Sequence, residues 1–161
     1  TPPWFIEDLV AGLRAAPEAG IATPVLRCDG ATLNALLADR RAGRVGGTTA
    51  VFGADHTGLY FSKEVIPFTP GTYADDAETP VFHHVGVYAY RPEALEAYAK
   101  RPAAPLELQE GLEQLRFLDA GLPVGTVLCE ATAWNVIELN NPTDVVLIEA
   151  ELARRAQLET S

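Results

Sequence analysis

The chain is short of cysteine and of basic residues, and it contains no methionine. Twelve Lys and Arg residues stand against 22 Asp and Glu residues, and the net charge of −10 repels a phosphate backbone, which argues against nucleic-acid binding. No apolar run is long enough to span a bilayer, and no segment has the pattern of a secretory signal. Cys28 and Cys129 have no neighbours at metal-ligand spacing, so we expect buried free thiols. These shortages predict a soluble cytoplasmic protein.

Methionine is absent even at position 1, where a natural gene product would begin. The first residues instead have the pattern of a helix start, with Thr1 as the N-cap and Pro2 in the first turn. This start predicts that an N-terminal portion of the protein is missing. The 161 residues, 48% hydrophobic and 21% charged, suffice for one folded domain over 1–161.

Helical and extended segments alternate along the chain. Apolar residues at helical spacing predict helices over 2–16, 32–41, 92–100, 108–118 and 142–156. Short apolar runs predict strands over 21–28, 48–52, 58–61, 81–91 and 124–129. The alternation favours an α/β sandwich, and the hairpin formed around GADHTG makes its sheet mixed.

The strand VFHHVGVYAYR carries unusual polar residues. Side chains alternate across a strand, so one face of this one is mostly apolar and predicted to meet the core: His83, Val85, Val87 and Ala89. The other face is polar: His84, Gly86, Tyr88 and Tyr90. Glycine within a strand often marks the close approach of a ligand. The strand is therefore either a slot that presents His84 and Tyr88 to a ligand or an edge strand with solvated aromatic residues.

Three other segments carry candidate polar groups. In APLELQEGLEQLRFL, a helix would align Glu110, Glu113 and Gln114 as one stripe, a pattern that is more often a solvated face than a site. The opposite side would carry four leucines: Leu108, Leu112, Leu115 and Leu118. Lys63 follows a strand, where it can neutralise an anion or remain solvated. Asn140 precedes a helix start, either as part of its cap or as a polar group at a strand-to-helix junction.

Four segments carry a family resemblance: GLYFSKEVIPF, HHVGVYAYRPEAL, PLELQEGLEQLRFLDAG and ELNNPTDV. In this order and at this spacing they resemble the CMP-Kdo synthetases, the 3-deoxy-manno-octulosonate (Kdo) cytidylyltransferases of lipopolysaccharide biosynthesis. The resemblance runs from the TPPWFI helix to the terminal helix. It implies a Rossmann-like nucleotidyltransferase of glycosyltransferase-A type, a three-layer α/β fold with a mixed sheet whose N-terminal half is missing here. It also implies a homodimer that uses CTP and Mg²⁺ to make CMP-Kdo and pyrophosphate.

The same resemblance assigns roles to individual residues. His84 and Tyr88 would line the sugar site, whereas His83 would be structural. Glu113 and Gln114 would bind the sugar hydroxyls, and Lys63 would face the negative end of the sugar. Asn140 stands where the family has a metal-binding aspartate, and a neutral carbonyl oxygen is a weaker Mg²⁺ ligand than a carboxylate.

Departures from the family pattern leave other functions open. The family's CTP loop is missing, so we expect the chain alone to be inactive, and a family lysine near Thr48 is replaced by GGTT. One alternative is a synthetase for CMP-nonulosonates, which are sialic-acid-like sugars. Another is a non-catalytic domain that binds an acidic sugar or forms oligomers.

Overall fold

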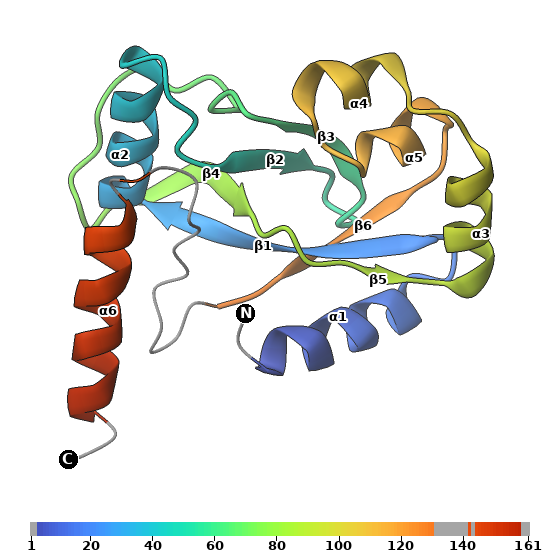
Figure 1. The fold of residues 1–161 in the computed structure, drawn as a ribbon, viewed down its shortest axis with the longest axis horizontal. Coiled ribbons are helices and arrows are strands. Elements are labelled where there is room, and N and C mark those ends of the chain that lie inside the picture. The colour runs from blue at the N-terminus through green and yellow to red at the C-terminus, as the bar shows by residue number, and fades with distance from the viewer. Residues whose placement is uncertain (1–2, 131–141, 143, 159–161) are drawn as a thin grey trace.

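A six-stranded mixed sheet forms the centre of the computed structural model, which describes residues 3–130, 142 and 144–158. In this sheet β6 (Val124–Leu128) runs parallel to β1 (Ile21–Asp29), and every other strand pair is antiparallel. The strand order is β3-β2-β4-β1-β5, with β6 paired to β1. The other strands are β2 (Thr48–Phe52), β3 (Gly58–Ser62), β4 (Glu78–His84) and β5 (Ala89–Tyr90). Figure 1 shows the arrangement of these strands.

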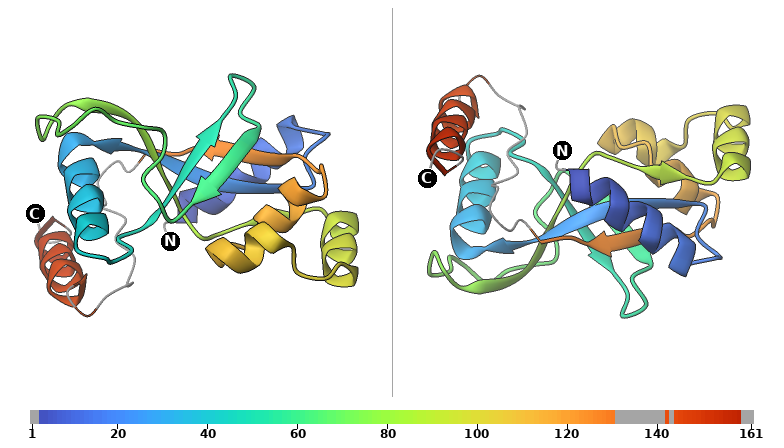
Figure 2. Two further views of the ribbon diagram at one scale, coloured as in Figure 1. Left: turned by 90° about the horizontal axis from the view of Figure 1, so that it is seen from above. Right: turned by 90° about the horizontal axis from the view of Figure 1, so that it is seen from below.

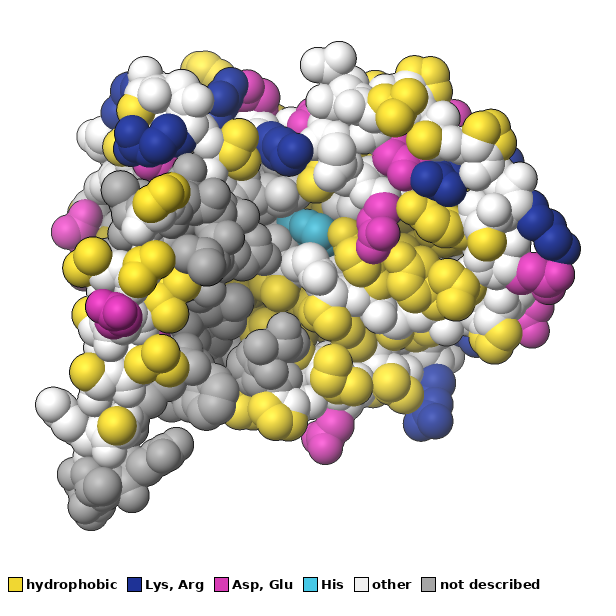
Figure 3. Space-filling view, in the orientation of Figure 1, with side chains coloured by type: hydrophobic (Ala, Val, Ile, Leu, Met, Phe, Trp, Pro, Cys, Tyr) yellow, Lys and Arg dark blue, Asp and Glu magenta, His cyan; other side chains and the backbone are white. Residues whose placement is uncertain are grey.

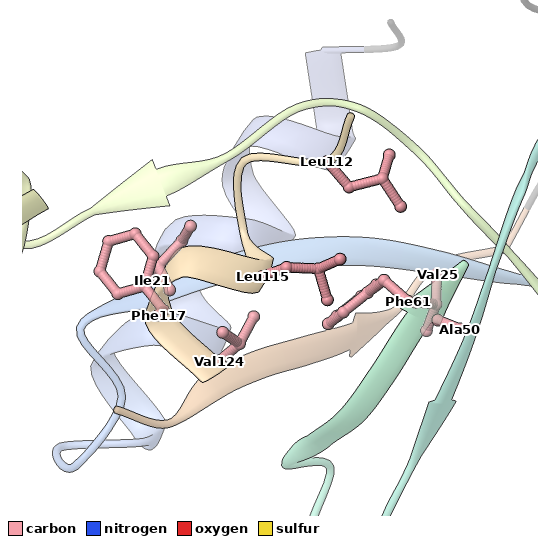
Figure 4. Packing of buried hydrophobic residues seen from close by; sticks show 8 residues of the cluster. All are labelled: Ile21, Val25, Ala50, Phe61, Leu112, Leu115, Phe117 and Val124. Atoms are coloured by element: carbon pink, nitrogen blue, oxygen red, sulfur yellow. The ribbon is translucent and has the colours of Figure 1, made fainter. Parts of the chain in front are cut away.

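The β2–β3 hairpin curls the sheet around a core. Its turn reaches β6, where the backbone N–H and the hydroxyl of Thr126 both donate to the carbonyl of His56, over 2.8 and 2.9 Å. The curved sheet encloses eight buried hydrophobic residues: Ile21, Val25, Ala50, Phe61, Leu112, Leu115, Phe117 and Val124. Figure 4 shows that these side chains come from β1, β2, β3, β6 and the α4–α5 segment.

Helices cover both faces of the sheet. On one face α1 (Pro3–Ala15) buries Phe5, Leu9 and Leu13, because these residues recur at helical spacing. On the opposite face lie α4 (Pro105–Glu110) and α5 (Leu115–Asp119), as both views of Figure 2 show. The remaining helices are α2 (Gly30–Arg41), α3 (Pro92–Lys100) and α6 (Asp144–Leu158), of which α6 lies near α2. None of the described helices is long and apolar enough to cross a membrane.

The expected strand over 81–91 is wrong as one continuous element. It ends at His84 and resumes at Ala89, and both parts pair with β1. Opposite the break, the Pro24 carbonyl accepts from Val85 N over 3.1 Å, but proline has no N–H to donate in return. The antiparallel ladder therefore cannot continue there.

The expected helix over 108–118 is also wrong, because Gly111 divides it into α4 and α5. Gly111 has φ 65° and donates to the Glu107 carbonyl over 2.7 Å, a common way for a helix to end. The predicted stripe of Glu110, Glu113 and Gln114 therefore does not form. The predicted apolar side fails at Leu108, which is 72% exposed.

Candidate functional site

The segment from His84 to Tyr90 separates two faces, as predicted, but neither face is solvated throughout. Val85, Val87 and Ala89 pack in the clusters beneath α1. Tyr88 and Tyr90 pack on the opposite side, against the core that contains Phe117. The polar face is covered only in part: His84 is buried, Tyr88 and Tyr90 are half-buried, and Gly86 is exposed.

His84 is buried on this covered side, with 2% of its surface exposed. Its Nε2 lies 2.9 Å from the Thr23 hydroxyl, and its ring contacts the rings of Phe61 and Tyr88. Burial, with a smaller effect of His83, lowers the pKa of His84 to about 3, so the imidazole is neutral at physiological pH. The expectation of a wet strand face is therefore wrong at His84, because Thr23 and the rings of Phe61 and Tyr88 pack around the imidazole.

Tyr88 joins this histidine to Gln114. The Tyr88 hydroxyl donates to Gln114 Oε1 over 2.9 Å. The Gln114 side chain is 0% exposed, and its Nε2 has no hydrogen-bond partner among the described residues. A buried amide donor without an acceptor costs free energy, about 1–3 kcal/mol. A water molecule or a ligand atom can supply the missing acceptor.

Glu113 and Tyr90 border the same region. The Tyr90 hydroxyl donates to Glu113 Oε1 over 3.2 Å at an exposed position. Burial and the adjacent Glu113 carboxylate both raise the pKa of Tyr90, which therefore remains protonated. Glu113 thus offers a negative group at the rim, outside the buried Tyr88–Gln114 pair.

Glu110 ties the end of α4 to the end of β3. Its carboxylate accepts from the Ser62 hydroxyl over 2.7 Å, from Lys63 N over 2.9 Å and from the Tyr60 hydroxyl over 3.3 Å. The Lys63 ammonium lies directly over Gly111, since a Cβ added to that glycine would be 2.9 Å from Nζ. A cation is therefore held beside the turn that leads to Glu113 and Gln114.

A second acidic residue fixes the other end of α4. Glu107 forms a two-pronged ion pair with Arg116 of α5, with N–O distances of 2.6 and 2.5 Å, and also accepts from Ala104 N. The hydrogen bonds from Arg116 lower the pKa of Glu107. The Arg116 guanidinium also lies 3.9 Å from the centre of the Tyr98 ring. These contacts hold α4 and α5 together.

The arrangement combines four kinds of group. Gln114 supplies a buried donor, His84 a neutral imidazole, Lys63 a cation and Glu113 a peripheral carboxylate. A Cβ at Gly86 would meet no described atom within 4 Å, so the space over this residue is open. Figure 3 shows a histidine side chain at the edge of a hydrophobic area on this side, with acidic side chains near it. These groups suit a small molecule that carries several hydroxyls and a negative charge.

Three contributors were absent from the sequence-based site: Thr23, Tyr90 as a partner of Glu113, and Glu110 as an anchor on β3. The predicted polar stripe was a weak signal for Glu110, and the alternation of side chains along the strand was a weak signal for Tyr90. Thr23 had none, because it lies in an apolar run and its partners are 61 to 64 positions away.

The described residues contain no group of three or more His, Cys, Asp or Glu residues that could hold a metal ion. Asn140, the predicted metal ligand, lies outside the described residues.

Comparison with known proteins places the chain among sugar-acid cytidylyltransferases, although no family model matches it. A 3-deoxy-manno-octulosonate cytidylyltransferase of Maricaulis maris (strain MCS10) is 36% identical over 157 residues, 98% of this chain and 60% of that protein. An 8-amino-3,8-dideoxy-manno-octulosonate cytidylyltransferase of Shewanella pealeana (strain ATCC 700345 / ANG-SQ1) is 37% identical over 102 residues, 63% of this chain and 39% of that protein.

A solved structure agrees with these relatives. That of a CMP:2-keto-3-deoxy-manno-octonic acid synthetase complexed with CTP matches with a TM-score of 0.69 and 28% identity, over 96% of this chain and 58% of that chain. The similarity confirms the expected α/β fold with a mixed sheet. The chain spans 60% of the length of the Maricaulis relative.

Proposed function

Because the chain belongs to the family of the 3-deoxy-manno-octulosonate cytidylyltransferases, the CMP-Kdo synthetases, we propose that the whole protein transfers CMP from CTP to Kdo. In this reaction the anomeric hydroxyl of the sugar attacks the α-phosphate of CTP, and pyrophosphate leaves. The chain described here supplies the sugar-acid site. Its residues bind and orient the sugar, which is the main requirement of such a transfer.

The observation that carries this proposal is the Nε2 of Gln114, which has no partner among the described residues. The Oε1 of the same amide accepts from the Tyr88 hydroxyl, and a sugar hydroxyl is a suitable acceptor for Nε2. Lys63 is assigned to the carboxylate of the sugar acid, because its ammonium enters no ion pair with a described residue. Glu113 is assigned to a hydroxyl at the rim.

A Tyr88→Phe variant tests the site. It removes the hydroxyl that orients Gln114, so we expect the KM for Kdo to rise about tenfold while the KM for CTP stays within twofold. Tyr98→Phe is a matched control, because its hydroxyl contacts Glu107 away from the site. Initial rates of pyrophosphate release from the whole protein provide both constants. An equal loss of affinity for Kdo and CTP would contradict the assignment.

The choice of sugar is tested with the same assay. Kdo, its 8-amino analogue and a nonulosonic acid are compared as substrates. The name of the Shewanella relative points to the 8-amino sugar as a second candidate substrate. The exposed carboxylate of Glu113 could pair with the ammonium group of that sugar. We expect the highest kcat/KM for Kdo, and a higher value for either competitor would reassign the substrate. Binding without any pyrophosphate release would favour a non-catalytic domain.

The Mg²⁺ requirement, homodimer and cytoplasmic location implied by the resemblance are part of this proposal. If Asn140 reaches the metal, Asn140→Asp should lower the Mg²⁺ concentration that gives half-maximal activity.

Leu95 of α3 and Leu108 of α4 are 48% and 72% exposed, which suits a contact between subunits. Sedimentation of Leu108→Glu against the unaltered protein tests that contact. Both cysteines are buried and free, as predicted, which agrees with a reducing compartment.

A further inference from the structure

Thr23 occupies the point where the sheet is interrupted. It lies in β1, is 0% exposed, and faces the segment between His84 and Ala89 that leaves the ladder. Its hydroxyl oxygen lies 3.1 Å from the Val85 carbonyl and 3.0 Å from the Val87 carbonyl. Pro24 cannot donate to Val85, and the Val85 carbonyl instead accepts from Val87 N over 2.7 Å and from the Thr23 hydroxyl.

The same oxygen lies 2.9 Å from Nε2 of His84, and this third contact determines where the protons are. A hydroxyl has one proton, and carbonyl oxygens can only accept. If the hydroxyl donated to His84, its oxygen would face the Val85 and Val87 carbonyl oxygens at 3.1 and 3.0 Å with no proton between them, at a buried and a partly buried contact. The consistent arrangement shares the hydroxyl proton between the carbonyls and lets Thr23 accept from His84 Nε2–H.

We propose that Thr23 is a positioning residue for the sugar site, because its hydroxyl holds His84 in the Nε2–H tautomer and bridges the break before Tyr88. The remaining ring nitrogen of His84, Nδ1, is then a bare acceptor. It can accept a hydrogen bond from a ligand hydroxyl, but it cannot donate one to a carboxylate. This last step rests on the proposed function and separates the roles of His84 and Lys63: the histidine binds a hydroxyl, and the lysine binds the acid group.

The tautomer is measurable without any ligand. In long-range ¹H–¹⁵N spectra of the whole protein, a protonated imidazole nitrogen and a bare one have well-separated shifts. We expect a protonated Nε2 and a bare Nδ1 for His84 in the unaltered protein and in Thr23→Ser, which keeps the hydroxyl. Thr23→Val should shift both nitrogens toward the average of two tautomers. Protonation at Nδ1 in the unaltered protein would overturn the proposal, as would an unchanged spectrum in Thr23→Val.

Thr126→Val is the matched control. Thr126 is the β6 partner of Thr23 and is 4% exposed, but its hydroxyl bonds the His56 carbonyl away from the site. We expect Thr23→Val to weaken Kdo binding about tenfold relative to Thr126→Val, with Thr23→Ser restoring most of it. Equal affinities in the two valine variants would overturn the positioning role.

The two proposals can fail separately. If Thr23→Val does not fold, the spectra of the unaltered protein and of Thr23→Ser still decide the tautomer. An unaltered protein with the expected tautomer but no affinity for any sugar acid would overturn the proposed function and would still support the contact between Thr23 and His84.

Discussion

Replacing Gly111 by alanine separates a backbone effect from an effect on Lys63. Gly111 has φ 65°, where a Cβ is strained by about 1–2 kcal/mol, while the less flexible unfolded chain offsets about 0.4–1 kcal/mol of this. The expected loss of stability is therefore about 1 kcal/mol. The new Cβ would also be 2.9 Å from Lys63 Nζ, but this ammonium ends a flexible side chain and can move aside at little cost.

Gly121→Ala provides the control for the backbone effect. Gly121 has φ 69° and also follows a helix, but a Cβ there meets nothing within 4 Å. Urea unfolding should therefore give similar losses for both variants, within about 0.5 kcal/mol of each other. Only Gly111→Ala displaces Lys63, so only this variant should raise the KM for the sugar acid, by about threefold to tenfold.

A double-mutant cycle tests whether Lys63 is the cause. Lys63→Met should raise the same KM, and adding Gly111→Ala to it should have no further effect. A stability loss about 2 kcal/mol larger in Gly111→Ala than in Gly121→Ala would show that Lys63 is rigid and would contradict the prediction. Equal KM values in the two alanine variants would contradict it as well.

Two further predictions concern the buried polar residues. Gln114→Met removes the unpartnered Nε2, which should stabilise the fold, and the Oε1 that accepts from Tyr88, which should destabilise it, so the stability should change by less than about 1 kcal/mol. The KM for the sugar acid should rise at least about tenfold. Urea unfolding and initial rates measure both, and a loss of stability above about 2 kcal/mol would show that the amide is mainly structural. Burial lowers the pKa of His84 from 6.5 to about 3, so below pH 6.5 the unfolded chain binds a proton that the folded chain does not. The stability contribution of neutral His84 is therefore present above pH 6.5 and is lost as the pH falls toward 3. The drop in the urea midpoint between pH 7 and pH 5 should be smaller in His84→Gln than in the unaltered protein. Equal drops in the two proteins would contradict the burial of a neutral imidazole.

Local signals in the sequence predicted several elements correctly. Pro92 and the helical spacing after it predicted α3, which runs from Pro92 to Lys100. The turn GADHTG predicted the β2–β3 hairpin, and the spacing of Phe5, Leu9 and Leu13 predicted the buried face of α1. These features depend on residues that are close in the sequence, so their physical causes are visible there.

The pattern around Gly111 shows where local signals mislead. The leucines of the 105–119 segment fit one helix, but the glycine ends α4, and Glu110 is then free to bind the end of β3. The energy that favours this break comes from partners about 48 positions away, which periodicity cannot reveal.

The sequence alone determined the family resemblance, the mixed α/β organisation, the free thiols and the alternation that sets Val85 and Tyr88 on opposite faces. Only the tertiary structure showed that His84 is buried and neutral, that Nε2 of Gln114 has no partner among the described residues, and that the Thr23 hydroxyl contacts both His84 and the segment after it. Protonation and hydrogen-bond partnership depend on which distant groups exclude water and which supply a donor. Those neighbours are brought together by folding of the sheet, and no spacing along the chain encodes them.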